Sequence, residues 1–204
     1  MKKQSPRTRR HIRTRQAILN AALSIVHEDG PDGLSMRTLA DRIDYSPAGL
    51  YEYFGSKEEI IAEVCDEGHR RLAAYMLEVE SSLSSTDYLY GIGLAYIRFA
   101  LENPDHFLLM FSSPQMAGDA PEDALPQDSE SSYGILLHGI ERGIDAGAFH
   151  VRPGFGLSEM GYAAWTLVHG MAMLRVTTLR DVPLDLDAAD HQALLNFMRG
   201  LQAA

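Results

Sequence analysis

Apolar residues recur at three- to four-residue intervals along nearly the whole chain, and strictly alternating apolar and polar patterns are absent. This spacing gives a helix one apolar face, whereas a half-buried strand needs a period of two. The pattern breaks at clusters of Gly, Pro and Asp. We therefore predict an all-α fold. The helices are expected at residues 12–28, just after Ser35, and at 46–54, 57–80, 86–102, 104–112, 129–147, 157–179 and 187–201.

End signals and apolar faces define the first helices. Gly30 is expected to end the first helix, and Ser56 and Glu59 have the spacing of a capping box. Residues 112–128 hold three prolines and four acids, which is typical of a mobile surface loop. The apolar face of the first helix comprises Ile12, Ile18, Leu19, Ala22, Ile25 and Val26. The inner face of the second comprises Met36, Leu39, Ala40 and Ile43.

The composition predicts a soluble, cytoplasmic protein. Its 204 residues are 46% hydrophobic, which is enough for one or two packed cores. The single cysteine, Cys65, excludes a disulfide framework, and no apolar signal core follows the basic N-terminus. The longest uncharged run, Met160 to Leu174, has 15 residues. That is shorter than the ~18–20 residues that cross a bilayer, so we expect no membrane segment.

The net charge of −10 is unevenly divided along the chain. Residues 1–57 carry 10 Lys or Arg and 6 Asp or Glu, a balance of +4, whereas residues 58–204 have a balance of −14. A polyanion would be attracted to the N-terminus and repelled by the rest. The alternative is a solvated basic tail without a partner. The uneven charge indicates DNA binding only if the next segment can also bind DNA. Seven cations precede the first acidic residue: Lys2, Lys3, Arg7, Arg9, Arg10, Arg13 and Arg15.

The stretch SPAGLYEYF, Ser46 to Phe54, follows the short second helix after a tight turn and has the outline of the second half of a helix-turn-helix. Ser46 is a capping residue, and Pro47 suits the first helical position. At about 100° per residue, Leu50 and Phe54 share one face, which can pack on the first two helices. The residues that point the other way are Ala48, Gly49, Glu52 and Tyr53.

The outward face suits a DNA major groove. Ala48 and Gly49 keep it thin, so that the backbone can approach base edges. Tyrosine hydroxyls at its flanks can reach phosphate oxygens, and Lys57 adds a cation at a helix N-terminus that favours an anion. The alternative is a three-helix core whose aromatic residues only fill volume. It explains Leu50 and Phe54, but not an exposed glycine beside two tyrosines and a lysine.

Residues 35–60, SMRTLADRIDYSPAGLYEYFGSKEEI, closely resemble the DNA-binding motif of the TetR family. The matching residues are Arg37, Ala40, Ser46, Leu50, Tyr51, Tyr53, Phe54, Ser56, Lys57 and Glu58. The resemblance implies a homodimeric transcriptional repressor with an N-terminal three-helix DNA-binding domain and a larger C-terminal helical domain. It implies core positions at Leu39, Ala40, Leu50 and Phe54. It implies DNA contacts by Arg37, Thr38, Ser46, Ala48, Gly49, Tyr51, Tyr53 and Lys57.

Two residues depart from the motif. Asp44 stands where the family usually has a turn glycine. Because Asp tolerates the left-handed conformation better than most residues, the turn is expected to survive with some strain. Glu52 places a carboxylate on the outer face, where it would weaken binding near phosphates or add specificity against a cytosine amino group. The sequence does not decide between these two roles.

Three parts of the chain are predicted: a flexible basic arm at 1–11, a helix-turn-helix domain at 12–57 and a second helical domain at 58–204. In the second domain, Trp165 and His169 lie one helical turn apart on an apolar face. This face is either core, with His169 satisfied by a neighbouring carbonyl or hydroxyl, or the wall of a ligand cavity. In the second case the expected ligand-binding residues are Phe107, Met110, Phe111, Trp165, His169 and Met173.

The Trp-x-x-x-His-Gly pattern from Trp165 to Gly170 resembles the C-terminal domain of one TetR subgroup. It implies a ligand-sensing and dimerising domain whose last two long helices form a four-helix interface. Small residues on the helix at 157–179 and apolar residues on the last helix are the expected dimer interface. They are Gly161, Ala164, Val168 and Ala172, with Leu194, Leu195, Phe197, Met198 and Leu201.

A ligand-responsive repressor is the leading hypothesis. The dimer binds a palindromic operator, and an effector of unknown identity favours a dimer whose recognition helices are wrongly spaced. A DNA-binding regulator without an effector is the alternative, which a second domain with no cavity above ~300 Å³ would favour.

An enzyme is the third possible class of protein. A nucleophile elbow, a phosphate-binding glycine loop and a two-histidine metal motif are missing from the sequence. Asp66 and His69 could share a metal, but two ligands without a convincing third are more typical of a solvated helix face. We therefore expect no catalytic residue, no metal and no cofactor.

Overall fold

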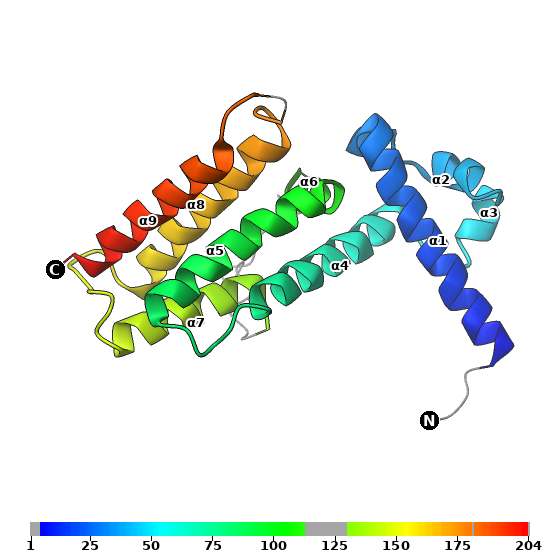
Figure 1. Cartoon of the computed structure of the whole chain (residues 1–204). Coiled ribbons are helices and arrows are strands. Elements are labelled where there is room, and N and C mark those ends of the chain that lie inside the picture. The colour runs from blue at the N-terminus through cyan, green and yellow to red at the C-terminus, as the bar shows by residue number, and fades with distance from the viewer. Residues whose placement is uncertain (1–4, 113–129, 181, 204) are drawn as a thin grey trace. The chain divides into compact units, whose positions relative to one another are not determined.

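The computed structural model describes residues 5–112, 130–180 and 182–203, and it confirms the all-α prediction (Figure 1). Lys2, Lys3 and all but the first residue of the loop predicted at 112–128 lie outside the described residues. The helices are α1 (Pro6–Asp29), α2 (Met36–Arg42), α3 (Pro47–Leu50), α4 (Lys57–Leu77), α5 (Ser85–Glu102), α6 (Pro104–Ser112), α7 (Ser132–Asp145), α8 (Leu157–Val176) and α9 (Leu186–Gln202), with a 3₁₀ turn at Pro31–Gly33.

The chain divides into two compact units, and the division differs from the predicted boundary at residue 57. The first unit contains α1, α2, α3, α4 as far as Gly68, and α6. The second contains the rest of α4 with α5, α7, α8 and α9. Helix α6 joins the first unit because it packs closely on α4: a Cβ on Gly68 would lie 2.4 Å from Met110 Sδ. In addition, Asp105 Oδ1 of α6 lies 2.9 Å from His27 Nδ1 of α1.

Helix α1 begins earlier than predicted. Ser5 Oγ accepts a hydrogen bond from the Thr8 N–H at 3.1 Å, and Pro6 occupies the first turn. Residues 6–11, predicted to be a flexible arm, are therefore helical. The buried stripe of α1 starts only at Ile18. Ile12 was predicted to belong to the apolar face, but its side chain is 49% exposed. The helix ends as expected, at Gly30 with φ 73°.

The core of the first unit forms on the predicted faces. Leu39, Ala40 and Leu50 are fully buried, and Phe54 is 1% exposed. Helix α4 starts with Ser56 Oγ accepting the Glu59 N–H at 3.1 Å. The Glu59 carboxylate accepts the N–H of Gly55 at 2.6 Å, one residue earlier than a standard capping box.

Arg15 of α1 connects three parts of the first unit. Its guanidinium donates hydrogen bonds to the Tyr53 carbonyl and to the Glu63 carboxylate of α4. It also lies over the Phe54 ring, with Cζ 4.0 Å from the ring centroid. A planar guanidinium can stack and donate in several directions at once, which an ammonium cannot. Arg15 therefore fixes the chain just after α3, and is not one of the solvent-facing cations that the sequence suggested.

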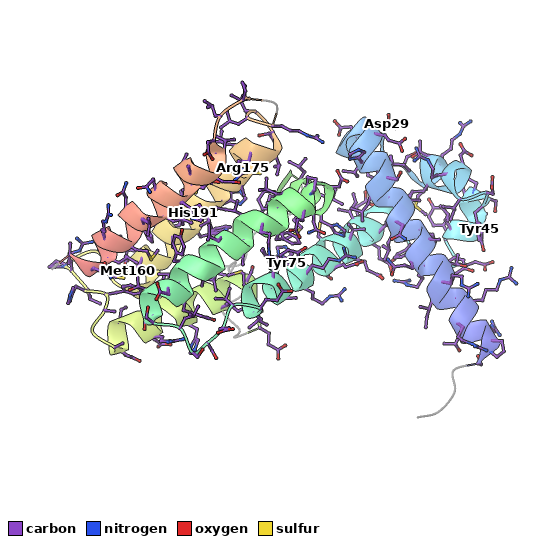
Figure 2. All side chains as sticks on the ribbon, in the orientation of Figure 1. Asp29, Tyr45, Tyr75, Met160, Arg175 and His191 are labelled. Carbon is purple, nitrogen blue, oxygen red and sulfur yellow. The ribbon has the colours of Figure 1, made fainter. Side chains whose placement is uncertain are left out.

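The second unit is built by α5, α7, α8 and α9 packing on one another (Figure 1). Helix α8 approaches α7 so closely that a Cβ on Gly161 would lie 2.6 Å from Leu137 Cδ2. Arg175, labelled in Figure 2, links α8 to α9. It contacts Asp187 at 2.7 Å and Asp190 at 2.8 Å.

The predicted dimer interface is largely buried inside this unit, which corrects that prediction. A Cβ on Gly93 of α5 would lie 3.5 Å from Val168 and 3.3 Å from Leu194, so these side chains fill the core of one protomer. The small residues are needed for close packing within the chain. The buried members are Gly161, Ala164, Val168, Ala172, Leu194, Met198 and Leu201.

None of the helices in the described ranges combines the length and apolar character that a membrane crossing requires.

We expect Arg15→Met to lower the melting temperature, because it removes two charge-assisted hydrogen bonds and a ring contact. The loss should be about 1–2 kcal/mol, or roughly 2–8 °C for a chain of this size. Arg15→Lys should restore only part of it. Thermal unfolding followed by circular dichroism measures the effect, with exposed Arg13→Met as the matched control. Equal melting of the two methionine variants would refute the structural role of Arg15.

Candidate nucleic-acid interface

Helix α2 starts with a reciprocal cap formed by Ser35 and Thr38. Ser35 Oγ accepts the Thr38 N–H at 3.1 Å, and Thr38 Oγ1 accepts the Ser35 N–H at 2.9 Å. The Thr38 hydroxyl also contacts the Gly33 carbonyl at 3.1 Å. Thr38 is exposed as predicted, but its hydroxyl already stabilises the start of α2.

The turn between α2 and α3 takes the conformation that the sequence predicted for Asp44. This residue has φ 54°, the sole positive φ outside glycine among the described residues. The N–H of Tyr45 donates to the Ala40 carbonyl at 2.9 Å, which closes the end of α2 in the pattern of a Schellman motif. Asp therefore replaces the usual turn glycine, at the cost of some backbone strain.

Helix α3 is a single turn, shorter than the predicted 46–54. Ser46 Oγ caps it by accepting the Gly49 N–H at 3.0 Å, and Pro47 takes the first helical position. A Cβ on Gly49 would lie 3.2 Å from Ser46 Oγ and 3.5 Å from the Tyr45 ring. Glycine at this position therefore also relieves local crowding, which the sequence did not reveal.

All eight residues predicted to contact DNA lie at the surface of the first unit. Tyr51 is 56% exposed. Gly49, Tyr53 and Lys57 are half-buried. The other four are exposed: Arg37, Thr38, Ser46 and Ala48.

Two aromatic residues that the sequence did not single out flank Tyr53. The His11 ring of α1 stacks on Tyr53, with centroids 4.8 Å apart and an interplanar angle of 23°. Tyr45, labelled in Figure 2, meets Tyr53 edge to face with ring centroids 6.2 Å apart. Hydrogen bonds with Thr14 and Tyr53 lower the pKa of the Tyr45 phenol from its ordinary value. These rings connect the N-terminal turns of α1 to the segment after α3.

The N-terminal turns of α1, which contact Tyr53 through His11, carry further cations. No acidic residue lies in the first turn, and the exposed arginines there are Arg7, Arg9, Arg10 and Arg13. Glu52 is exposed on the same segment as Tyr51 and Tyr53. The surface therefore combines guanidinium groups, phenols and a lysine with two small residues. Such a set can donate to phosphate oxygens while a backbone enters a groove.

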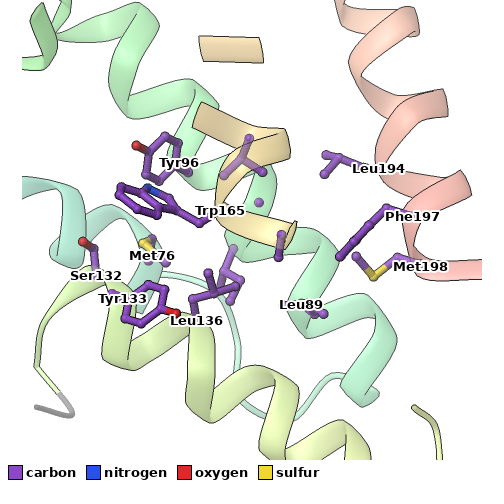
Figure 3. A pocket seen from close by; sticks show the side chains of 14 residues that line it. Met76, Leu89, Tyr96, Ser132, Tyr133, Leu136, Trp165, Leu194, Phe197 and Met198 are labelled. Atoms are coloured by element: carbon purple, nitrogen blue, oxygen red, sulfur yellow. The ribbon is translucent and has the colours of Figure 1, made fainter. Parts of the chain in front are cut away.

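An apolar cavity of about 40 Å³ lies in the second unit, between α5, α7, α8 and α9 with Met76 of α4 (Figure 3). Tyr96 and Trp165 lie side by side at one end of it, and Leu194, Phe197 and Met198 approach from α9. Tyr96 OH and His169 Nδ1 are 2.9 Å apart.

The predicted ligand-binding residues are divided between the two units. Trp165 lines the cavity, and His169 stands beside it through its contact with Tyr96. Met173 is half-buried farther along α8. Phe107, Met110 and Phe111 lie on α6 in the first unit, with Phe107 and Met110 fully buried. The pocket prediction for the whole set stays a prediction.

Known families cover most of the chain. The family "Bacterial regulatory proteins, tetR family" matches residues 18–64, and "Tetracyclin repressor-like, C-terminal domain" matches residues 89–197. An uncharacterised HTH-type transcriptional regulator of Mycobacterium tuberculosis is 23% identical over 194 residues, which are 93% of this chain and 82% of that protein. One from Bacillus subtilis is 27% identical over 94 residues, 46% of this chain, so the match spans about half (49%) of that relative.

Solved structures share the fold. The TetR family regulator PfmR of Thermus thermophilus has a TM-score of 0.70 at 24% identity, covering 91% of this chain and 99% of its own. The ketosteroid regulator KstR2 of Mycobacterium tuberculosis has a TM-score of 0.69 at 19% identity, covering 94% and 96%.

These matches extend to function only at the level of the family. The Trp-x-x-x-His-Gly subgroup stays a prediction, because the matched C-terminal family does not name it. The family and both sequence relatives are transcriptional regulators rather than enzymes. The chain belongs to the TetR family of DNA-binding transcriptional regulators.

Proposed function

We propose that the protein is a homodimeric repressor that binds a palindromic operator and leaves it when a small molecule binds to the second unit. The observation that supports DNA binding is that the α3 segment has one buried side and one exposed side. Leu50 and Phe54 are buried behind it, while Ala48 and Tyr51 are exposed in front. The arginines of α1 belong to the same unit.

In this proposal α3 enters the major groove. The small side chains of Ala48 and Gly49 let the backbone approach base edges. Tyr51 and Tyr53 place hydroxyls on phosphates, and Lys57 adds a charge contact at the start of α4. Glu52 either weakens binding near phosphates or adds specificity against a cytosine amino group.

A charge-free outer face of α8 supports the dimer. Tyr162 is 63% exposed and Leu174 48% exposed, and Thr166 and Gly170 lie exposed between them at four-residue intervals. The stretch 160–174 contains no Asp, Glu, Lys or Arg. A solvent-facing helix face without charges is typical of an interface rather than of a free surface. The dimer interface therefore lies on this exposed face of α8, opposite the buried stripe, together with exposed Leu195 of α9.

The effector part has an alternative that one observation favours. The cavity of about 40 Å³ is far below the ~300 Å³ of ordinary ligand pockets. The volume of this cavity fits a regulator without a small-molecule effector better. An effector must therefore enlarge the cavity as it binds, which is a change of state that can be coupled to DNA release.

Lys57→Ala should weaken binding to duplex DNA from upstream of its own gene and flatten the salt dependence. Loss of one phosphate contact reduces the slope of log K against log salt by about 0.9. Fluorescence anisotropy at several salt concentrations measures the slope, with exposed Arg180→Ala in the second unit as control. An unchanged slope for Lys57→Ala would argue against this face as the DNA surface.

The arginines of α1 should be tested by substitution rather than by deletion, because the helix already begins at Pro6.

Ala48→Leu should reduce DNA affinity at least roughly tenfold, or about 1.4 kcal/mol, without lowering the melting temperature. The larger side chain holds the backbone away from base edges but points into solvent. The same substitution at exposed Ala74 of α4 is the control. Retained affinity in Ala48→Leu would show that close backbone approach is not needed.

Thr166→Arg should convert the dimer into a monomer, because a buried charge without a partner is strongly unfavourable at an interface. Size-exclusion chromatography with light scattering measures the mass. Ala74→Arg, on an exposed part of α4, should leave the dimer intact. A dimer that survives Thr166→Arg places the interface elsewhere.

A further inference from the structure

We propose that the cavity beside Trp165 binds a slender, uncharged molecule that is mostly hydrocarbon and carries a single hydrogen-bonding group. This inference rests on the proposed function, since the molecule would be its effector. It goes further by naming the chemical class and the walls of the site.

The lining excludes charged ligands. Fourteen residues line the cavity, and none of them is Asp, Glu, Lys, Arg or His. Most are aliphatic or methionine side chains, such as Leu89, Ile92 and Val168. A carboxylate, phosphate or ammonium group buried here would have no opposite charge to pair with, and burying an unpaired ion is strongly unfavourable. An apolar chain gains from the same surroundings.

One end of the cavity supplies neutral polar groups. Tyr96 lines it with its hydroxyl 2.9 Å from His169 Nδ1, and Ser132 and Tyr133 lie nearby (Figure 3). Burial raises the pKa of the Tyr96 phenol and lowers the pKa of the His169 imidazole. Both groups are therefore uncharged at neutral pH. They suit an alcohol, carbonyl or amide group, which exchanges hydrogen bonds without bringing charge.

The small volume restricts the shape of the molecule. About 40 Å³ is far less than the ~300 Å³ of an ordinary ligand pocket, so a ligand must be narrow or displace side chains. Met76 of α4 and Met198 of α9 both line the cavity, and their unbranched side chains can change rotamer to make room. Trp165 and Phe197 also line the cavity and are half-buried. A narrow chain can enter by moving these side chains, whereas a rigid polycyclic molecule needs far more space.

Three eight-carbon probes test directly whether the cavity prefers an uncharged ligand to a charged one. Trp165 is the only tryptophan in the chain, so its fluorescence reports on this cavity. At pH 8, 1-octanol should give a saturable change in emission, whereas octanoate and octylamine should bind at least tenfold more weakly. Equal or tighter binding of either ion would overturn the inference, and so would the absence of any saturable response to 1-octanol up to its solubility limit.

Two variants locate the probe. Met198→Ala enlarges the cavity and should tighten 1-octanol binding several-fold. Met171→Ala is the matched control, since Met171 is a half-buried methionine of α8 that does not line the cavity. Ala164→Phe should abolish binding by filling the space, and Met198→Ala still decides the matter if that variant does not fold. Equal effects of Met198→Ala and Met171→Ala would overturn the assignment.

Operator binding, measured on the same samples without probe, separates this inference from the proposed function. Intact DNA binding with no response to 1-octanol overturns the ligand class and leaves the DNA-binding role standing. Saturable 1-octanol binding in a protein that fails to bind DNA supports the cavity assignment and refutes the repressor proposal.

Discussion

The burial of Leu50 and Phe54 is the contact on which the DNA-facing surface depends. Helix α3 is a single turn, Pro47–Leu50, and isolated helices that short are unstable in water. It holds its shape because Leu50 is fully buried, Phe54 is 1% exposed and Arg15 lies over the Phe54 ring. The exposed side of α3 is therefore a consequence of what is packed behind it.

Sequence reasoning succeeded where structure depends on near neighbours in the chain. Helical spacing and the family resemblance both placed Leu39, Ala40, Leu50 and Phe54 inside, where they are buried, although Met36 and Ile43 of the same predicted inner face are only half-buried. Turn chemistry explained how Asp44 reaches a positive φ. It failed for contacts between distant residues. Arg15 bonds to the carbonyl of Tyr53, 38 residues away, and nothing in the sequence distinguishes Arg15 from exposed Arg13. Only the packed arrangement of α1, α3 and α4 reveals the difference.

The second unit shows a different limit of pattern reasoning. Small residues on one side of α8 do mark a close approach, but the neighbour is α7 or α5 of the same chain. The spacing indicates that something packs closely, not what it is. The same limit applies to α6, whose phenylalanines have helical spacing but belong to the first unit. Which unit a short helix joins depends on long-range packing that its own residues do not encode.

A one-turn helix held by tertiary contacts has little local stability of its own. Segments of this kind open more readily than the domain around them, and their backbone amides exchange with solvent through that opening. A duplex that binds only the ordered form shifts this opening equilibrium by mass action. The affinity for DNA therefore contains the free energy of ordering residues 46–54, and any change behind Phe54 alters it without touching a base or a phosphate.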